Sequence, residues 1–104
     1  MTEQIFTYSV TDEKTIERII QSEPVHVNHM VLPEGESFPE HAANAQVYMA
    51  VLRGALTIHL NDHEPHTYER GTVLVIPKGT KMKGTNLRGD VLELLIFKSF
   101  ADKG

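Results

Sequence analysis

From Pro24 onward, the chain is a succession of short β-prone runs that are separated by turn residues at close intervals. The predicted strands cover residues 25–32, 46–52, 55–60, 66–69, 72–76, 80–86 and 91–98. A typical boundary is Pro77-Lys78-Gly79, which follows a strongly apolar run. Many short strands with turn signals between them are typical of β-sandwiches and β-barrels. The sequence therefore predicts an all-β fold for residues 25–98.

The segment before Pro24 has a different pattern. Residues 4–8 are β-prone and could pair at a sheet edge. The isoleucines that follow recur at helical spacing: Ile16, Ile19 and Ile20. Thr11 or Asp12 can serve as the N-cap, so we predict one short helix over residues 12–21. These isoleucines would cover one end of the barrel or contribute to a dimer.

Length and composition limit the number of domains and the class of partner. A chain of 104 residues allows one domain, with an N-terminal strand and helix in residues 1–22 and the barrel in residues 25–98. The chain has no cysteine, which excludes disulfides and thiolate metal sites. Its net charge of -4 disfavours nucleic acid, and its longest apolar runs are too short to cross a membrane. Since it also lacks a signal-peptide pattern, we expect a cytoplasmic protein.

Two sets of turn residues have a characteristic spacing. The first set is Gly35, His41 and Gly54, and the second is Gly71, Pro77, Gly79 and Asn86. Both sets match the two sequence motifs of the cupin superfamily without insertions, so the chain resembles a small single-domain cupin over residues 25–97. The resemblance implies a double-stranded β-helix (jelly-roll) barrel, with a homodimer as the expected assembly. It also implies that Asn86 braces the loop after Met82.

The resemblance further implies metal ligands at four positions, which cupins fill with two histidines and a glutamate in the first motif and a histidine in the second. In this sequence the four positions hold His41, Ala43, Val47 and Met82. Alanine and valine supply no donor, and a thioether suits only soft ions. We therefore expect no metal and no other cofactor. A divalent metal remains an alternative only if His26 or His66 faces the barrel and rebuilds the site.

A ligand pocket is predicted in the barrel interior near these positions. Its expected lining is His41, Ala43, Val47, Met49, Met82, Met30 and Phe38. The methionines either fill gaps in the core or form a flexible apolar pocket. His41 lies at the mouth, where it contacts a ligand, acts as an acid or base, or is purely structural. A basic cluster in the stretch from residue 78 to residue 88, expected at the rim of the pocket, could steer a carboxylate toward it: Lys78, Lys81, Lys83 and Arg88.

Strand alternation gives two further expectations. Glu93 shares a face with Leu95 in the last strand, which places it on the outer face or at a subunit contact. His26 and His29 lie on opposite faces of one strand, and His26 faces inward if Met30 does.

Three functions remain open at this stage. The favoured one is metal-free binding or sensing of a small organic ligand in the barrel. The second is an enzyme, either a metal-dependent dioxygenase or isomerase with relocated ligands or a metal-free acid–base catalyst that uses His41. The third is a scaffold protein whose barrel is filled with side chains. The expected partners are a small molecule and a second copy of the chain.

Overall fold

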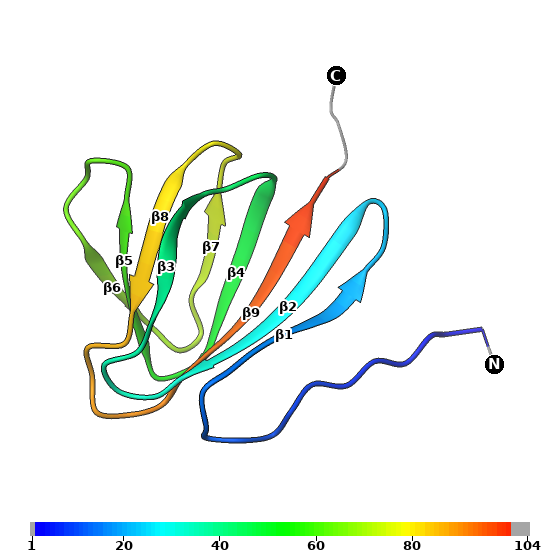
Figure 1. Ribbon diagram of the computed structural model, residues 1–104, viewed down its shortest axis with the longest axis horizontal. Coiled ribbons are helices and arrows are strands. Elements are labelled where there is room, and N and C mark those ends of the chain that lie inside the picture. The colour runs from blue at the N-terminus through cyan, green and yellow to red at the C-terminus, as the bar shows by residue number, and fades with distance from the viewer. Residues whose placement is uncertain (1, 101–104) are drawn as a thin grey trace.

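The computed structural model describes residues 2–100, which form nine β-strands and no helix (Figure 1). In chain order the strands are β1 (Thr15–Gln21), β2 (Val25–Leu32), β3 (Ser37–Ala42), β4 (Gln46–Arg53), β5 (Ala55–Leu60), β6 (His66–Glu69), β7 (Val73–Ile76), β8 (Lys81–Thr85) and β9 (Leu92–Ser99). The all-β prediction is confirmed. Since residues 2–100 contain no helix, they contain none long and apolar enough to cross a membrane.

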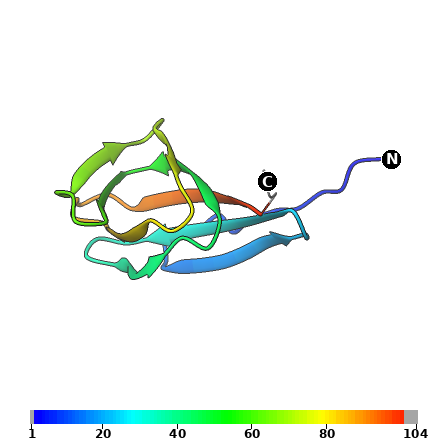
Figure 2. The same ribbon diagram turned by 90° about the horizontal axis from the view of Figure 1, so that it is seen from above.

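The strands form two antiparallel sheets. The five-stranded sheet has the order β1-β2-β9-β4-β7, and the four-stranded sheet has the order β3-β8-β5-β6. Figure 2 shows the strands curving around a common interior. This interior holds the hydrophobic core, in which Leu32, Leu56 and Leu94 are completely buried. The inner face of the five-stranded sheet thus points into the barrel, whereas its outer face points away from it.

The predicted helix over residues 12–21 is wrong. The chain forms β1 there instead, and β1 pairs antiparallel with β2. The register shifts between Arg18 and Ile20, so Ile19 is an extra residue in the strand. Such a β-bulge interrupts the regular alternation of side chains, and Ile19 and Ile20 are both half-buried although they are neighbours. The apparent helical spacing of the isoleucines therefore comes from a bulged strand.

Two other segments differ from the sequence-based expectation. β3 was not predicted because its sequence is largely polar and contains Pro39, which cannot donate a ladder hydrogen bond. β3 lies at the edge of its sheet, where a proline is tolerated. Residues 4–8, which were expected to pair at a sheet edge, lie outside the strands. They belong to an extended N-terminal arm, residues 2–10, which projects from the barrel (Figure 1).

Two glycines permit close contacts that shape the barrel. Gly54 has a φ of 72°, and a Cβ at this position would collide with the backbone carbonyl of Val91. Gly84 in β8 lies against the ring of Phe38, and a Cβ there would overlap that ring. The absence of a side chain at residue 84 therefore lets Phe38 fold into the interior, where it forms one wall of the cavity described next.

Candidate functional site

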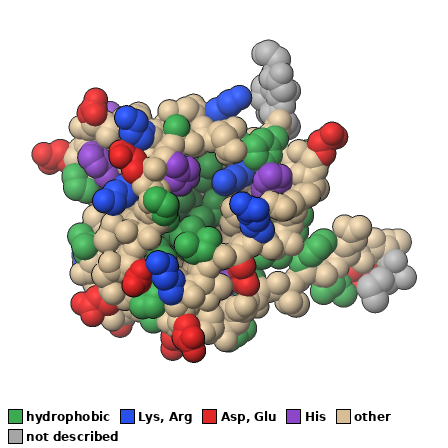
Figure 3. All heavy atoms as spheres, in the orientation of Figure 1, with side chains coloured by type: hydrophobic (Ala, Val, Ile, Leu, Met, Phe, Trp, Pro, Cys, Tyr) green, Lys and Arg blue, Asp and Glu red, His purple; other side chains and the backbone are tan. Residues whose placement is uncertain are grey.

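A cavity of about 290 Å³ opens into the barrel between the two sheets. Six strands contribute to its lining, which consists of Ile16, Asn28, Met30, Phe38, Pro39, His41, Val47, Met49, Met82, Ile96 and Lys98. Figure 3 shows this hollow, with hydrophobic side chains inside it and histidine and basic side chains at its border. The lining includes six of the seven predicted pocket residues, and the seventh, Ala43, is buried in the same hydrophobic core. The volume is at the lower end of the range for ligand cavities, so the site suits a compact molecule.

Asn28 brings a polar group to an otherwise apolar wall. It lies two residues before Met30 in β2, so both side chains point to the inner face. The Oδ1 atom of Asn28 is buried and has no hydrogen-bond partner, and it is the one buried side-chain N or O atom in this condition among residues 2–100. A buried acceptor without a partner destabilises a protein by about 1–3 kcal/mol. A hydrogen-bond donor on a ligand would remove this cost.

His41 lies at the mouth of the cavity and is exposed. Its Nδ1 atom is 2.9 Å from the backbone carbonyl oxygen of Pro39. Because a carbonyl oxygen can only accept, Nδ1 donates this hydrogen bond, and Nε2 of the neutral ring is then an acceptor. The ring also packs edge-on against Phe38, with centroids 5.9 Å apart. These two contacts orient the imidazole and fix which nitrogen can accept a proton or hydrogen bond.

Two cations lie near the polar part of the cavity. Lys98 of β9 lines the cavity directly and pairs in register with Val47 of β4. Arg18 of β1 is exposed and lies at the register position opposite Asn28. None of the residues that line the cavity is acidic. The border of the cavity is therefore electropositive, although the whole chain carries a net charge of -4.

The positions that the cupin resemblance assigns to metal ligands do not provide a donor set for a divalent ion. His41 pairs with Met82 across β3 and β8, and Val47 lines the same cavity. Iron, manganese and nickel sites need several nitrogen or oxygen donors, and here the imidazole of His41 is the one such donor at the four positions. Within residues 2–100, no group of three His, Cys, Asp or Glu side chains is arranged so that it could hold a metal ion.

The other predicted candidates lie away from the cavity. His26 packs against Phe100, with ring centroids 4.5 Å apart, and His66 is exposed beside Tyr68. Neither histidine lines the cavity. The predicted basic cluster does not line it either: Lys78, Lys81, Lys83 and Arg88. The ammonium group that does reach the cavity belongs to Lys98, which the sequence analysis did not select.

Asn86 braces the loop between β8 and β9. Its side chain is completely buried, and its Nδ2 donates to the carbonyl oxygens of Leu32 at 2.8 Å and Asp90 at 2.7 Å. Its Oδ1 accepts a hydrogen bond of 3.0 Å from the backbone N–H of Arg88. Asn86 therefore ties the end of β2 to this loop, and it does not line the cavity.

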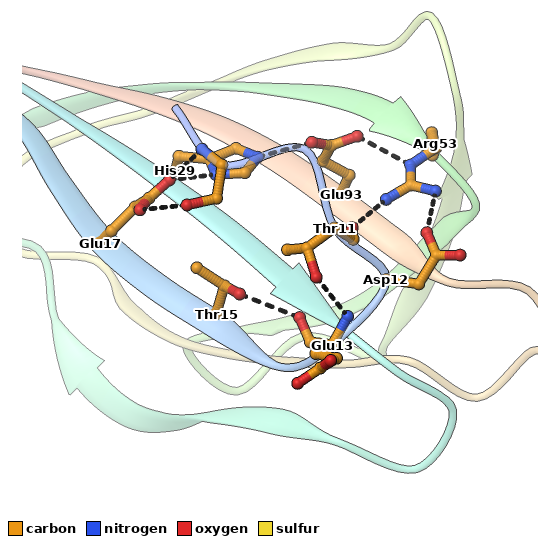
Figure 4. Close-up of polar contacts among 9 residues, drawn as sticks. Thr11, Asp12, Glu13, Thr15, Glu17, His29, Arg53 and Glu93 are labelled. Carbon is orange, nitrogen blue, oxygen red and sulfur yellow. Dashed lines mark hydrogen bonds and ion pairs between the residues drawn. The ribbon is translucent and has the colours of Figure 1, made fainter. Parts of the chain in front are cut away.

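A second polar cluster lies on the outer face of the five-stranded sheet (Figure 4). His29 is completely buried there, with Nδ1 2.9 Å from a carboxylate oxygen of Glu17 and Nε2 2.6 Å from one of Glu93. Glu93 also accepts a hydrogen bond of 2.8 Å from Nε of Arg53. The ring of Tyr8, from the N-terminal arm, lies over His29 with centroids 4.2 Å apart. The arm thus covers a polar side chain that strand alternation alone would leave exposed.

Glu93 lies on the outer face, as strand alternation predicts, and it is only 8% exposed because His29 and Arg53 of its own chain pack against it. The two carboxylates lie on opposite sides of the His29 ring, so Nδ1 and Nε2 each face a hydrogen-bond acceptor. The backbone N–H of Ser9 and the His29 side chain hold the pKa of Glu17 below its ordinary value. Hydrogen bonds to Asp12 and Glu93 raise the pKa of Arg53.

Comparison with known proteins identifies the family. The sequence model of the cupin domain matches residues 28–97, which is more than half of the chain. The chain belongs to the cupin family. The match begins within β2 and ends within β9, so the N-terminal arm and β1 of this cupin lie outside the matched region.

Individual relatives support the family and the fold. The uncharacterized protein MJ0764 of Methanocaldococcus jannaschii is 36% identical over 101 residues, which cover 95% of this chain and 86% of that protein. The crystal structure of MJ0764 itself, described as an RmlC-like cupin family protein with a double-stranded β-helix fold, has a TM-score of 0.92 at 34% identity, covering 95% of this chain and 92% of that one. An uncharacterized Klebsiella pneumoniae protein with a double-stranded β-helix domain has a TM-score of 0.81 at 13% identity, covering 98% and 94%. The last likeness shows the fold alone. The predicted jelly-roll barrel is confirmed.

Proposed function

We propose that this cupin domain binds a compact, mainly apolar organic molecule that carries a hydrogen-bond donor and an anionic group, without the help of a metal ion. The observation that carries the proposal is the buried, unpartnered Oδ1 of Asn28 in the cavity wall. A ligand N–H or O–H group in the cavity would give this atom its hydrogen bond. The donor set at the family's metal positions supports the metal-free form of the proposal, since only His41 among them is a nitrogen or oxygen donor.

The rest of the cavity supports the proposed ligand chemistry. Three methionines surround its apolar part: Met30, Met49 and Met82. Their unbranched side chains adapt to irregular apolar shapes. Lys98 in the lining and Arg18 opposite Asn28 favour an anionic group at the border, where a charge-assisted hydrogen bond is stronger than a neutral one.

Acid–base catalysis at His41 is the second candidate. It is supported by the hydrogen bond to Pro39, which leaves Nε2 free of the proton in the neutral ring. Binding without catalysis is favoured, because His41 and Lys98 are the two titratable side chains in the lining, and acid–base catalysis usually relies on groups placed around the reacting atoms. Turnover of a bound ligand that is lost in His41→Ala would favour the enzyme.

Thermal-shift measurements with a matched series of probes test the binding function. Toluene, benzamide and benzoate share one apolar ring and differ in their polar group. We expect benzamide and benzoate to raise the Tm of the wild type more than toluene does, since binding to the native state stabilises it. The variant Asn28→Leu should remove the advantage of benzamide, and Lys98→Met should remove the advantage of benzoate.

The ligand-free variants provide an independent check. Asn28→Leu should raise the Tm without any probe, because it replaces an unpaired buried acceptor with an apolar side chain of similar size. Asn44→Leu is the matched control, since Asn44 is exposed and does not line the cavity. It should leave the response to all three probes unchanged. Equal probe shifts in the wild type and both cavity variants, or no shift from any probe, would contradict the proposal.

A further inference from the structure

The polar groups of the ligand cavity lie on three neighbouring strands, β1, β2 and β9 (Figure 1). Arg18 of β1 pairs in register with Asn28 of β2, and Asn28 pairs with Ile96 of β9. Lys98 follows Ile96 by two residues, so both side chains point to the same face. Directly opposite Cβ atoms in an antiparallel pair lie about 4.5–5.5 Å apart, and diagonal neighbours about 7–8 Å apart. Two cations therefore flank the amide of Asn28 from two different strands.

Arg18 belongs to the face of the sheet that carries the cavity. Ile16 lines the cavity, whereas Glu17 contacts His29 on the outer face. Alternation places Arg18 on the inner face with Ile16, because the β-bulge follows Arg18 and leaves this part of β1 regular. Within residues 2–100, neither Arg18 nor Lys98 forms an ion pair. An anionic ligand can therefore pair with both.

This spacing limits the distance between the two polar groups of the ligand. The side chain of Asn28 is short, so its unpaired Oδ1 stays close to the sheet. Arginine and lysine have long side chains that can reach an anion lying beside this atom. The donor and the anionic group must then be neighbours in the ligand. A donor on the far side of the apolar group would lie away from Asn28, in the part of the cavity that the methionines surround.

The charge of the cavity identifies the donor as a neutral group. None of the lining residues is acidic. An ammonium group beside Asn28 would be buried near two cations without a carboxylate to pair with, which is costly. A hydroxyl group carries no charge, and it is the smallest neutral donor that fits a cavity of about 290 Å³.

We propose that the ligand is a 2-hydroxycarboxylate with one compact apolar substituent, whose hydroxyl group donates to Oδ1 of Asn28 while its carboxylate lies between Arg18 and Lys98. This inference rests on the proposed binding function. Hydroxyl, carboxylate and apolar substituent are all attached to one carbon atom and are held at three different places. The site therefore distinguishes the two enantiomers of such a ligand.

Isothermal titration calorimetry on the full chain with mandelate and matched compounds tests the ligand class. One mandelate enantiomer should bind the wild type about tenfold more tightly than phenylacetate, which lacks the hydroxyl group, because a buried acceptor gains its partner. The opposite enantiomer should bind no more tightly than phenylacetate. Two further compounds should also bind more weakly than the preferred enantiomer: 4-hydroxyphenylacetate, an isomer of mandelate with a distant hydroxyl group, and phenylglycine, which carries an ammonium group instead.

Three variants assign the contacts. Asn28→Leu should bind both mandelate enantiomers equally and should still bind phenylacetate. Asn28→Asp should favour phenylglycine over mandelate, since a carboxylate there pairs with the ammonium group. Arg18→Gln should weaken the binding of mandelate and phenylacetate by similar factors. Arg70→Gln is the matched control, because Arg70 is exposed and does not line the cavity, and it should leave all affinities unchanged.

The outcomes separate this inference from the binding function on which it rests. If benzamide and benzoate raise the Tm of the wild type but neither mandelate enantiomer binds more tightly than phenylacetate, the 2-hydroxycarboxylate class is wrong and the binding function stands. A wild type that binds none of the compounds overturns both. An enantiomer preference that persists in Asn28→Leu overturns the hydrogen bond to Asn28, and unchanged affinities in Arg18→Gln overturn the contact with β1.

Discussion

Removing the negative charge of Glu93 should destabilise the fold strongly, although Glu93 is far from the ligand cavity. Its side chain is 11% exposed and accepts hydrogen bonds from Nε2 of His29 and Nε of Arg53. In Glu93→Gln, the amide keeps one acceptor oxygen and presents an NH₂ group to one of these two donors. At least one hydrogen bond to the Glu93 carboxylate is therefore lost.

The size of the effect follows from the burial of each partner. A hydrogen bond to a charged group contributes about 1.5–3 kcal/mol. The bond to His29 counts fully because His29 is completely buried, whereas Arg53 is 41% exposed and its bond is weakened by solvent. We expect Glu93→Gln to lower the free energy of unfolding by about 2–3 kcal/mol. For a domain of this size that lowers the Tm by roughly 10–20 °C.

Urea unfolding followed by far-UV circular dichroism at neutral pH measures this loss. Glu36→Gln is the matched control, since Glu36 pairs with Lys14 at side-chain exposures of 42% and 52% and should lose less than about 1 kcal/mol. All proteins are compared at one concentration, because dimerisation would make stability depend on it. If Glu93→Gln loses no more than Glu36→Gln, the buried network does not stabilise the fold as argued.

Two further predictions concern pH and metal binding. The pKa of Glu17 is held below its ordinary value in the folded protein. Its contribution to stability is therefore present above the pKa that it has in the unfolded chain, and it is lost as the pH falls through the folded pKa. When urea unfolding is measured from neutral to acidic pH, the free energy of unfolding should fall less steeply in Glu17→Gln than in the wild type, and identical slopes would refute this. The triple variant Ala43→His, Val47→Glu and Met82→His should restore a four-ligand site with His41 and bind a divalent metal by elemental analysis, whereas the wild type should not. A folded triple variant without metal would contradict the motif alignment, and near-equimolar metal in the wild type would contradict the metal-free proposal.

The barrel could be predicted from the sequence because the turn residues that separate its strands are recognisable locally and recur at close intervals. Turn residues mark the strand ends, and Gly54 and Gly79 have the positive φ that such turns require. The prediction of a helix over residues 12–21 was wrong for a physical reason. A β-bulge at Ile19 gives neighbouring isoleucines similar burial, and this pattern in the sequence alone is the same as that of a helical face.

The candidate site was predictable only in part. Met49 and Met82 follow from the motif spacing and alternation, and both line the cavity. The sequence analysis missed Asn28. It lies two residues before Met30 in β2, so strand alternation would have placed both side chains on the same inward face. The burial of His29 and Glu93 could not be read from alternation. It depends on where the N-terminal arm lies, and that contact joins segments far apart in the sequence.

The five-stranded sheet carries the ligand cavity on its inner face and the hydrogen-bond network of His29 and Glu93 on its outer face. Asn28 and His29 are neighbours in β2, so the strand that presents the unpaired amide to the cavity is held from its other side by the buried charge network. β9 has the same division, with Glu93 in the network and Lys98 at the cavity. β2 and β9 pair along their whole length, from Val25 with Ser99 to Leu32 with Leu92. Weakening the hydrogen bonds of His29 and Glu93 should therefore also change the distance between the side chains of Asn28 and Lys98. Benzamide and benzoate should then bind Glu93→Gln more weakly than Glu36→Gln, even at temperatures where both variants remain folded.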